Sequence, residues 1–372
     1  MNFDLSDEQK LLSEQARRLL AERSAPSRLR QLIDGGEEWD EPLWRELGGL
    51  GFLGVLIPEA YGGLGLSELD LAVICLELGR ANACLPFCSS IVLAADAITL
   101  AGSAEQQARW LPLLASGDLV ATLAYNEGLA GWSERGMRAE IRDGRLFGTK
   151  SPVADGGVAG LAVVLAKSEG TPVLVAVALD QPGCRRTRLE SFDQLRAHYA
   201  LAFDGAEAEV LTRATAREML PRLFDRAAVQ LAFEAVGGAE ACLYMARDYA
   251  LERRIFSRPL AGYQAIKHKL ADVLAALELA RSSAFYAGWA AANDDRELPR
   301  AAAAARLMAI SAFEQAAREA AQVHGGVAYT YEANCHFYYR RERTLALSLG
   351  GRERWADRLL QHHPDAALWA RA

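Results

Sequence analysis

The chain has 372 residues, 51% of them hydrophobic and 24% charged, which is ordinary for a soluble globular protein and enough for two or three domains around a large core. Its formal net charge of −7 disfavours nucleic acid and anionic membrane surfaces as partners, because both repel an acidic protein. No apolar run reaches the roughly 20 residues that a membrane-spanning helix needs.

The first residues and the use of cysteine and histidine favour a cytoplasmic protein. Residues 1–9 are polar and acidic, so we expect no signal or transit peptide. The six cysteines are scattered without a Cys-x-x-Cys pair, which predicts reduced core thiols. The six histidines show no ligand spacing with cysteine or carboxylate, and we predict no metal site.

Residues 1–119 are predicted to form a helical domain. Ser6 and Gln9 fit a capping box at the start of the first helix. Apolar residues then recur at the helical period up to about Leu119. The pattern breaks at Gly35-Gly36, from Pro58 to Gly65, and near Pro86.

Residues 120–212 change character and predict a small β domain. The pair Asp143-Gly144 is a hairpin signal. Alternating or continuous apolar runs predict strands at 121–125, 138–142, 145–150, 161–166, 173–178 and 200–203.

Helical periodicity returns in residues 213–372, with interruptions predicted at 253–264 and 325–335. The first interruption contains Pro259, where one helix cannot continue into the next. It also carries Arg253, Arg254 and Arg258 close to Gln264. Arginine forks bind phosphate oxygens in pairs, so this turn suits an anion such as a pyrophosphate. A basic turn lying in solvent is the alternative.

Four motifs together resemble the acyl-CoA dehydrogenase family. In chain order they are Pro58-Glu59-x-Tyr61-Gly62-Gly63-Leu64-Gly65; Arg253-x-x-Phe256 with Pro259, Gln264 and Lys269-Leu270-Ala271-Asp272; Gln322-Val-His324-Gly325-Gly326-Val-Ala-Tyr329-Thr330; and Arg340-Arg341 followed by Gly350. The resemblance covers roughly residues 3–360. It implies an α+β, mostly α, three-domain fold: an N-terminal helical domain (1–119), a middle β domain (120–212) and a C-terminal four-helix bundle (213–372).

The resemblance also implies FAD as cofactor. In the family, the neighbouring subunit holds the adenosine and pyrophosphate part of FAD. The matching residues here are Arg253, Phe256, Gln264, Gln322, Gly325 and Gly326. Ser133 aligns with a serine near the phosphates. The two glycines would let the backbone approach a ligand closely, and a helix-terminating turn is their alternative role. His324 and His336 are expected to pack within this loop region rather than to act in catalysis.

The usual catalytic base is missing. The family removes the α proton of a thioester with a carboxylate while the β hydride passes to the flavin. Its two positions for that carboxylate hold Leu349 and Ala227 here, and neither side chain accepts a proton. The catalytic residue is therefore unknown. Glu234, seven residues after Ala227, is the best of three nearby carboxylates; the other two are Asp225 and Glu353.

The ring side of the flavin site also departs from the family. Where the family has Trp-Ile-Thr, Lys150 is followed by Ser151-Pro152-Val153-Ala154-Asp155-Gly156. An earlier Thr-Glu-Pro loop appears as Asn126-Glu127-Gly128. The ring-side pocket of this chain therefore looks weakened, whereas its pyrophosphate-binding half looks retained.

Three hypotheses follow. The chain is the base-less subunit of a heteromeric acyl-CoA dehydrogenase, paired with a paralogous subunit in a heterotetramer. Alternatively it is a homo-oligomeric FAD enzyme of this fold with a displaced base or different flavin chemistry, or a flavin-free scaffold subunit. The resemblance implies an acyl-CoA substrate and electron-transfer flavoprotein as the electron acceptor, and it leaves the acyl group unspecified.

Overall fold

The structure, a computed structural model, describes residues 5–128, 133–293 and 296–365. By their internal contacts the residues form two compact units. The helical unit consists of Met1–Arg30, Glu68–Ala83 and Ala228–Ala372, and the sheet unit consists of Gln31–Ser67 and Cys84–Ala227. The division of the sequence into 1–119, 120–212 and 213–372 remains a prediction about domains. None of the described helices combines the length and apolarity that crossing a membrane requires.

The helical unit opens with α1 (Asp7–Arg23), which has the predicted capping box. The Ser6 hydroxyl accepts the Gln9 N–H, and the Gln9 side chain accepts the Ser6 N–H, both at 3.1 Å. α2 (Pro26–Gly35) then ends at the predicted glycine pair. The longer helices that follow are α4 (Glu68–Ala81), α7 (Ala216–Glu252), α8 (Gln264–Asn293), α9 (Leu298–His324), α10 (Cys335–Leu347) and α11 (Arg352–Gln361).

Two glycines bring α4 and α7 into close contact. A Cβ atom at Gly79 would lie 1.9 Å from the Glu234 carbonyl oxygen, and one at Gly237 would lie 1.9 Å from that of Leu76. Only glycine permits this approach, so the two helices pack backbone against backbone. The same contact brings charged residues of α4 and α7 within reach of each other.

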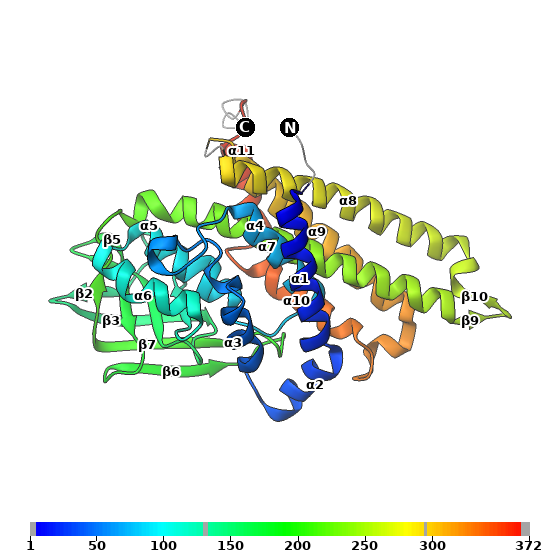
Figure 1. The fold of residues 1–372 in the computed structure, drawn as a ribbon, viewed down its shortest axis with the longest axis horizontal. Coiled ribbons are helices and arrows are strands. Elements are labelled where there is room, and N and C mark those ends of the chain that lie inside the picture. The colour runs from blue at the N-terminus through cyan, green and yellow to red at the C-terminus, as the bar shows by residue number, and fades with distance from the viewer. Residues whose placement is uncertain (1–4, 129–132, 294–295, 366–372) are drawn as a thin grey trace. The chain divides into compact units, whose positions relative to one another are not determined.

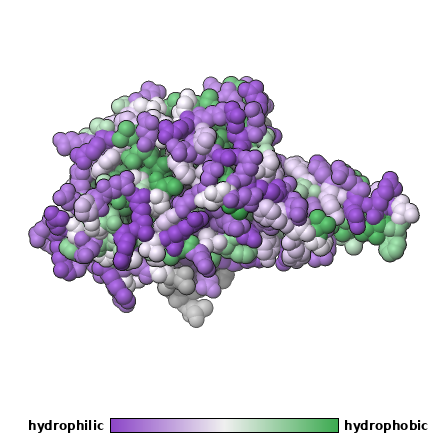
Figure 2. Space-filling view, turned by 90° about the horizontal axis from the view of Figure 1, so that it is seen from below, coloured by the Kyte–Doolittle hydropathy of each residue, from purple (hydrophilic) through white to green (hydrophobic). Residues whose placement is uncertain are grey.

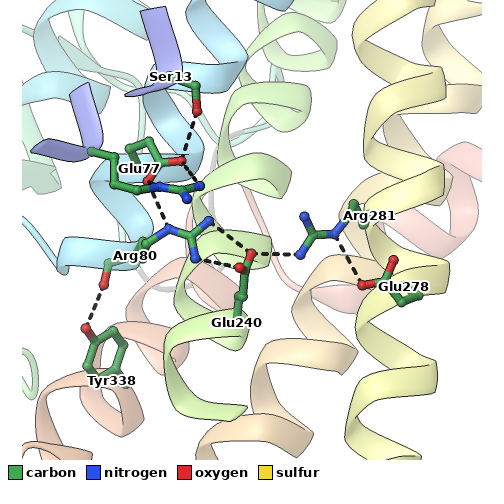
Figure 3. A network of polar contacts seen from close by, with 8 residues as sticks. Ser13, Glu77, Arg80, Glu240, Glu278, Arg281 and Tyr338 are labelled. Carbon is green, nitrogen blue, oxygen red and sulfur yellow. Dashed lines mark hydrogen bonds and ion pairs between the residues drawn. The ribbon is translucent and has the colours of Figure 1, made fainter. Parts of the chain in front are cut away.

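A charge network crosses the interior of the helical unit (Figure 3). Arg80 of α4 stands at its centre, with Nε 2.9 Å from Glu77 Oε2 and Nη1 2.6 Å from Glu240 Oε1. The buried Glu77 also accepts hydrogen bonds from Ser13 and Arg17 of α1. Arg281 of α8 donates to Glu240 at 2.7 Å. The network therefore ties α1, α4, α7 and α8 together.

α8 and α9 lie side by side and antiparallel. Lys269, in the second turn of α8, pairs with Glu319 near the end of α9 at 2.6 Å. Tyr286, near the end of α8, donates to Glu297 just before α9 at 2.9 Å. In Figure 1, α7 leads into the short β9–β10 hairpin and α8 leads out of it. The start of α8 and the end of α9 therefore lie at the hairpin end of the helical unit.

The sheet unit is built on an eight-stranded sheet in the order β6-β7-β3-β2-β4-β5-β8, with β1 pairing parallel to β4. Its strands are β1 (Ala121–Ala124), β2 (Glu140–Arg142), β3 (Arg145–Ala154), β4 (Leu161–Ser168), β5 (Thr171–Ala178), β6 (Cys184–Leu189), β7 (His198–Glu207) and β8 (Glu209–Val210). Its shorter helices are α3 (Glu41–Gly49), η1 (Phe52–Gly54), η2 (Glu59–Tyr61), η3 (Cys88–Ala95), α5 (Asp96–Ala101) and α6 (Ala104–Ser116).

The six predicted strands are all present, within a few residues of their expected ends. The hairpin at Asp143-Gly144 is confirmed: both residues have positive φ, 49° and 71°, and Arg142 pairs with Arg145 across the turn. Features that were not predicted include strands β6 and β8, the β9–β10 hairpin, the π-helical form of η3, and the break between α8 and α9. Strand β6 was not predicted because its sequence, Cys184-Arg-Arg-Thr-Arg-Leu189, lacks the apolar alternation that marks a half-buried strand.

Candidate functional site

The basic turn between α7 and α8 is a two-residue β-hairpin. β9 (Arg254–Ile255) pairs with β10 (Arg258–Pro259), and Phe256 and Ser257 form the turn. Both turn residues have positive φ, 48° and 65°. Such a turn normally contains asparagine or glycine, and holding a phenylalanine there costs about 1–3 kcal/mol. Phe256 is also 91% exposed, so contacts with the described residues do not offset this strain.

Among the three arginines of the turn, Arg253 alone has an uncommitted side chain within the described residues. Arg254 donates to the Ser257 carbonyl at 3.3 Å. The Arg258 guanidinium lies over the Tyr263 ring, 3.7 Å from its centroid. Arg253 is exposed, and its guanidinium makes no hydrogen bond, ion pair or ring contact with a described residue. It is therefore the arginine that can bind an anion without breaking an existing contact.

The structure brings six of the predicted cofactor residues to one end of the helical unit. Gln264 begins α8, and Gln322 lies in the last turn of α9. Tyr249, one turn before Arg253, stacks on His324 at 4.2 Å between ring centroids. The six residues that share this end are Arg253, Phe256, Gln264, Gln322, Gly325 and Gly326. The amide end of α8 adds partial positive charge beside Arg253, which suits a phosphate group.

Gly325 and Gly326 form an open backbone surface at the same end. Gly325 ends α9 with φ 62° and ψ −141°, a conformation reserved for glycine, and begins the 3₁₀ turn η5 (Gly325–Tyr329). A Cβ at either glycine would meet nothing within 4 Å. Both predicted roles are thus compatible: Gly325 terminates a helix, and the bare backbone can accept a ligand at close range.

The two histidines of this region pack against aromatic rings. His324 stacks on Tyr249, and its Nδ1 lies 2.8 Å from the Ala320 carbonyl. His336 stacks on Tyr331 and lies against Phe337. Burial lowers the pKa of His336, which favours the neutral ring. Both side chains serve packing, as expected.

Ser133 belongs to the sheet unit and is not part of this group. It lies on an exposed segment before β2, where its hydroxyl accepts the Gly136 N–H at 3.0 Å. Its role near a phosphate remains a prediction.

The two residues predicted to occupy the positions of the usual base are both buried and apolar. Leu349 is 3% exposed and has φ 60° in the link between α10 and α11, and Ala227 is fully buried in α7. Of the three carboxylates considered, Asp225 is buried in α7 and Glu353 is exposed in the first turn of α11. Neither residue predicted at a usual base position therefore provides a proton acceptor.

Glu234 is engaged in a buried ion pair. Its Oε1 lies 3.3 Å from Arg341 Nη1, and Arg341 also donates to the Ala83 carbonyl. Both side chains are almost fully buried. The ion pair engages Oε1 and fixes the Glu234 side chain inside the helical unit, so this carboxylate is held by Arg341 rather than free to reach a substrate.

Glu342 of α10 is a buried carboxyl that the sequence did not single out. Burial, opposed by Arg343 with Nε at 2.7 Å, raises its pKa to about 7. It lies in the charged run Arg340 to Arg343, which predicts a solvated surface. Helical spacing could have predicted the burial of Glu342 only if the buried face of α10 had been known.

Glu342→Gln is expected to stabilise the protein most at alkaline pH. A folded pKa of about 7 against an ordinary 4.5 means that stability is fully present below pH 4.5 and is lost as pH rises through 7. The variant should gain about 3 kcal/mol relative to the unmodified chain between pH 4.5 and pH 8. Urea unfolding across this range measures the difference, with the exposed Glu353→Gln of α11 as control. If the free energy of unfolding depends on pH in the same way for Glu342→Gln and the unmodified chain, the raised pKa of Glu342 is contradicted.

On the predicted ring side, the sheet unit holds a buried ion pair. Lys150 Nζ lies 2.6 Å from Glu127 Oε1, and Glu127 also accepts the N–H groups of Arg138 and Ala139. Against the effect of burial, these hydrogen bonds lower the pKa of Glu127. Lys150 and Glu127 therefore pair with groups of this chain. The segment from Ser151 to Gly156 supplies no aromatic ring and no threonine hydroxyl for a flavin ring.

Comparison with known proteins gives consistent matches over most of the chain. The N-terminal domain model of acyl-CoA dehydrogenases matches residues 6–118, and the C-terminal domain model matches residues 218–361. The chain is 30% identical to acyl-CoA dehydrogenase FadE27 of Mycobacterium tuberculosis (strain ATCC 25618 / H37Rv), over 88% of this chain and 89% of that protein.

Two solved structures are similar in both sequence and fold. A variant of the Tcur3481-Tcur3483 steroid ACAD matches with a TM-score of 0.88 and 31% identity, covering 97% of this chain and 99% of that one. The ChsE4-ChsE5 complex from Mycobacterium tuberculosis matches with a TM-score of 0.89 and 27% identity, covering 96% of this chain and 98% of that one. The predicted mostly helical α+β fold is confirmed.

Proposed function

Because the chain belongs to the acyl-CoA dehydrogenase family, we propose that it is the subunit without the usual catalytic glutamate in a heteromeric acyl-CoA dehydrogenase. The observation that carries the proposal is an asymmetry within the chain. Leu349 and Ala227, the residues predicted at the two base positions, are buried and apolar, and the best alternative, Glu234, is ion-paired with Arg341. Arg253, in contrast, is exposed and uncommitted within the described residues.

The residues at the hairpin end fit the adenosine and pyrophosphate part of FAD. Arg253 offers a free fork for phosphate oxygens, the start of α8 offers N–H groups, and Gly325 and Gly326 offer bare backbone. The ring side fits poorly, because residues 151–156 lack the groups that would face the ring. When bound, FAD supplies the acceptor for the hydride from the β carbon of an acyl-CoA thioester. This chain would hold one half of that cofactor, and the partner would provide the ring pocket and the base.

Exposed apolar side chains at the same end support a partner subunit. Phe256 is 91% exposed, Tyr329 88% and Val327 49%. Figure 2 shows apolar surface at the end of the molecule that carries the β9–β10 hairpin. Apolar surface beside an unpaired arginine suits a protein surface that carries a bound anion.

Two related structures also support a partner subunit. The ChsE4-ChsE5 complex and the Tcur3481-Tcur3483 steroid ACAD are each named for two components. We accordingly place this chain with a paralogous acyl-CoA dehydrogenase subunit, as a heterotetramer in the cytoplasm. Electron-transfer flavoprotein would take the electrons, as the family resemblance implies.

Substitution of Glu234 tests where the base resides. Glu234→Gln in the complex of this chain with its paralogue is expected to leave the rate of flavin reduction by acyl-CoA within about twofold, because the base lies in the partner. Removing the partner's own catalytic carboxylate should abolish reduction. If Glu234→Gln abolishes reduction and this chain is active alone, a homo-oligomeric enzyme with a displaced base replaces the proposal. A complex whose flavin and activity survive without Arg253 would favour the scaffold role.

The strained hairpin gives a second expectation. Phe256→Asn should weaken flavin retention in the complex about tenfold, because it removes an exposed aromatic contact, and it should not lower the unfolding temperature, because asparagine tolerates positive φ. Ser257→Asn is the matched control, which leaves Phe256 in place. Equilibrium dialysis measures flavin retention, and thermal unfolding measures the unfolding temperature. If Phe256→Asn retains flavin as well as the unmodified chain does, Phe256 does not belong to the flavin site.

A further inference from the structure

Arg30 of α2 forms a clamp on the segment that follows the glycine turn. Its Nε donates to the Tyr331 carbonyl at 3.2 Å, and its Nη2 donates to the Glu332 carbonyl at 2.6 Å and to Asn334 Oδ1 at 2.8 Å. The remaining amino group, Nη1, donates to the Pro26 carbonyl of its own helix at 3.3 Å. One guanidinium thus holds three acceptors about 300 positions away in the sequence.

Aromatic rings enclose the same guanidinium. It lies over Phe337 at 5.1 Å and over Tyr331 at 5.8 Å from the ring centroids. Tyr331 in turn stacks on His336. Cation–π contacts and charge-assisted hydrogen bonds act together here, so the clamp fixes both the backbone and the side chains of the segment.

The clamped segment begins directly after η5 (Gly325–Tyr329). Several hydrogen bonds of this turn and its continuation are local, from Thr330 to Val327 and from Phe337 to Asn334. Gly325 and Gly326 have no side chains that could anchor them. A glycine turn loses much conformational entropy when it is fixed. The buried Ala328 packs the middle of η5, and contacts on either side of the turn hold its ends. The stack of His324 on Tyr249 is one anchor, and Arg30 is the other.

We propose that Arg30 is a positioning residue for the cofactor turn: it holds 331–334 so that Gly325 and Gly326 are presented in the binding conformation. This inference rests on the proposed function, since the ligand is FAD. A ligand's apparent affinity falls in proportion to the population of the binding-competent state, so loosening one anchor weakens binding without touching the ligand. Lysine would preserve the charge but not the planar fork that reaches three acceptors.

Hydrogen exchange and FAD titration of three variants test the clamp. Arg30→Gln is expected to raise amide exchange in residues 325–334 at least tenfold in the chain alone, and to weaken FAD binding by the complex about tenfold. Arg30→Lys should recover part of both effects. The matched control is Arg18→Gln, an exposed arginine of α1 without a described partner, which should change neither. The unfolding temperature of each variant reports any general loss of stability.

The outcomes separate the clamp from the wider proposal. Unchanged exchange in Arg30→Gln overturns the clamp. Raised exchange with FAD affinity within twofold of the unmodified complex also overturns it, because the segment would then be ordered for another reason. A complex that binds FAD only through the partner, with Arg253 and Arg30 both dispensable, overturns the proposed function as well.

Discussion

Arg253→Ala is expected to weaken FAD binding by the complex about 10- to 150-fold. Hydrogen bonds to a charged group contribute about 1.5–3 kcal/mol, and about 1.4 kcal/mol corresponds to a factor of ten. Arg253 is the turn arginine with an uncommitted guanidinium among the described residues, so its removal should cost ligand contacts rather than folding. Fluorescence titration with FAD measures the affinity, and mass measurement of the complex shows whether assembly is intact.

Arg254→Ala is the matched control for this experiment. Arg254 adjoins Arg253 and carries the same charge, but its side chain donates to the Ser257 carbonyl within the hairpin. We expect a change in FAD affinity of less than threefold, since only general electrostatic attraction is lost. Equal losses in the two variants would mean that net charge, and not a specific fork, attracts the cofactor.

Arg80→Met is expected to lower the free energy of unfolding by about 3 kcal/mol, near the lower end of the range for breaking a buried ion pair. The variant leaves Glu77 and Glu240 in the interior of the helical unit (Figure 3). The loss is moderated because Arg17 still pairs with Glu77 and Arg281 still pairs with Glu240. Urea unfolding at pH 7 measures the difference.

The pH dependence and a surface control make this prediction specific. Hydrogen bonds from Arg80, outweighing burial, lower the pKa of Glu240 from 4.5. Its stabilising contribution is therefore present above pH 4.5 and is lost as pH falls below that value, so the difference between Arg80→Met and the unmodified chain should shrink in acid. Glu278→Gln breaks only the half-exposed 3.5 Å pair with Arg281 and should cost less than about 1 kcal/mol. A loss in Arg80→Met as small as in this control would contradict the network.

Local signals allowed much of the fold to be predicted. The Ser6–Gln9 capping box and the Asp143-Gly144 turn each depend on a few adjacent residues, and both are confirmed. The π-helical η3 and strand β6 depend on packing that no local pattern encodes. The close approach of α4 and α7 depends on Gly79 and Gly237 meeting across a long sequence separation, which periodicity does not reveal.

The candidate site shows the same limit. Motif spacing identified residues that the structure gathers at one end of α7, α8 and α9, although their role toward a cofactor remains a proposal. Glu342 and Arg30 were missed because each lies in an ordinary charged stretch. Burial raises the pKa of Glu342, and Arg30 donates to acceptors about 300 residues away in the sequence. Both are consequences of tertiary structure.

The most direct test of the central claim is the visible spectrum and mass of this chain, purified alone and co-expressed with an acyl-CoA dehydrogenase paralogue. We expect the chain alone to be colourless, and the co-expressed material to be a yellow complex of both subunits that acyl-CoA bleaches. A yellow homo-oligomer of this chain that acyl-CoA reduces without a partner would contradict the assignment of a base-less subunit.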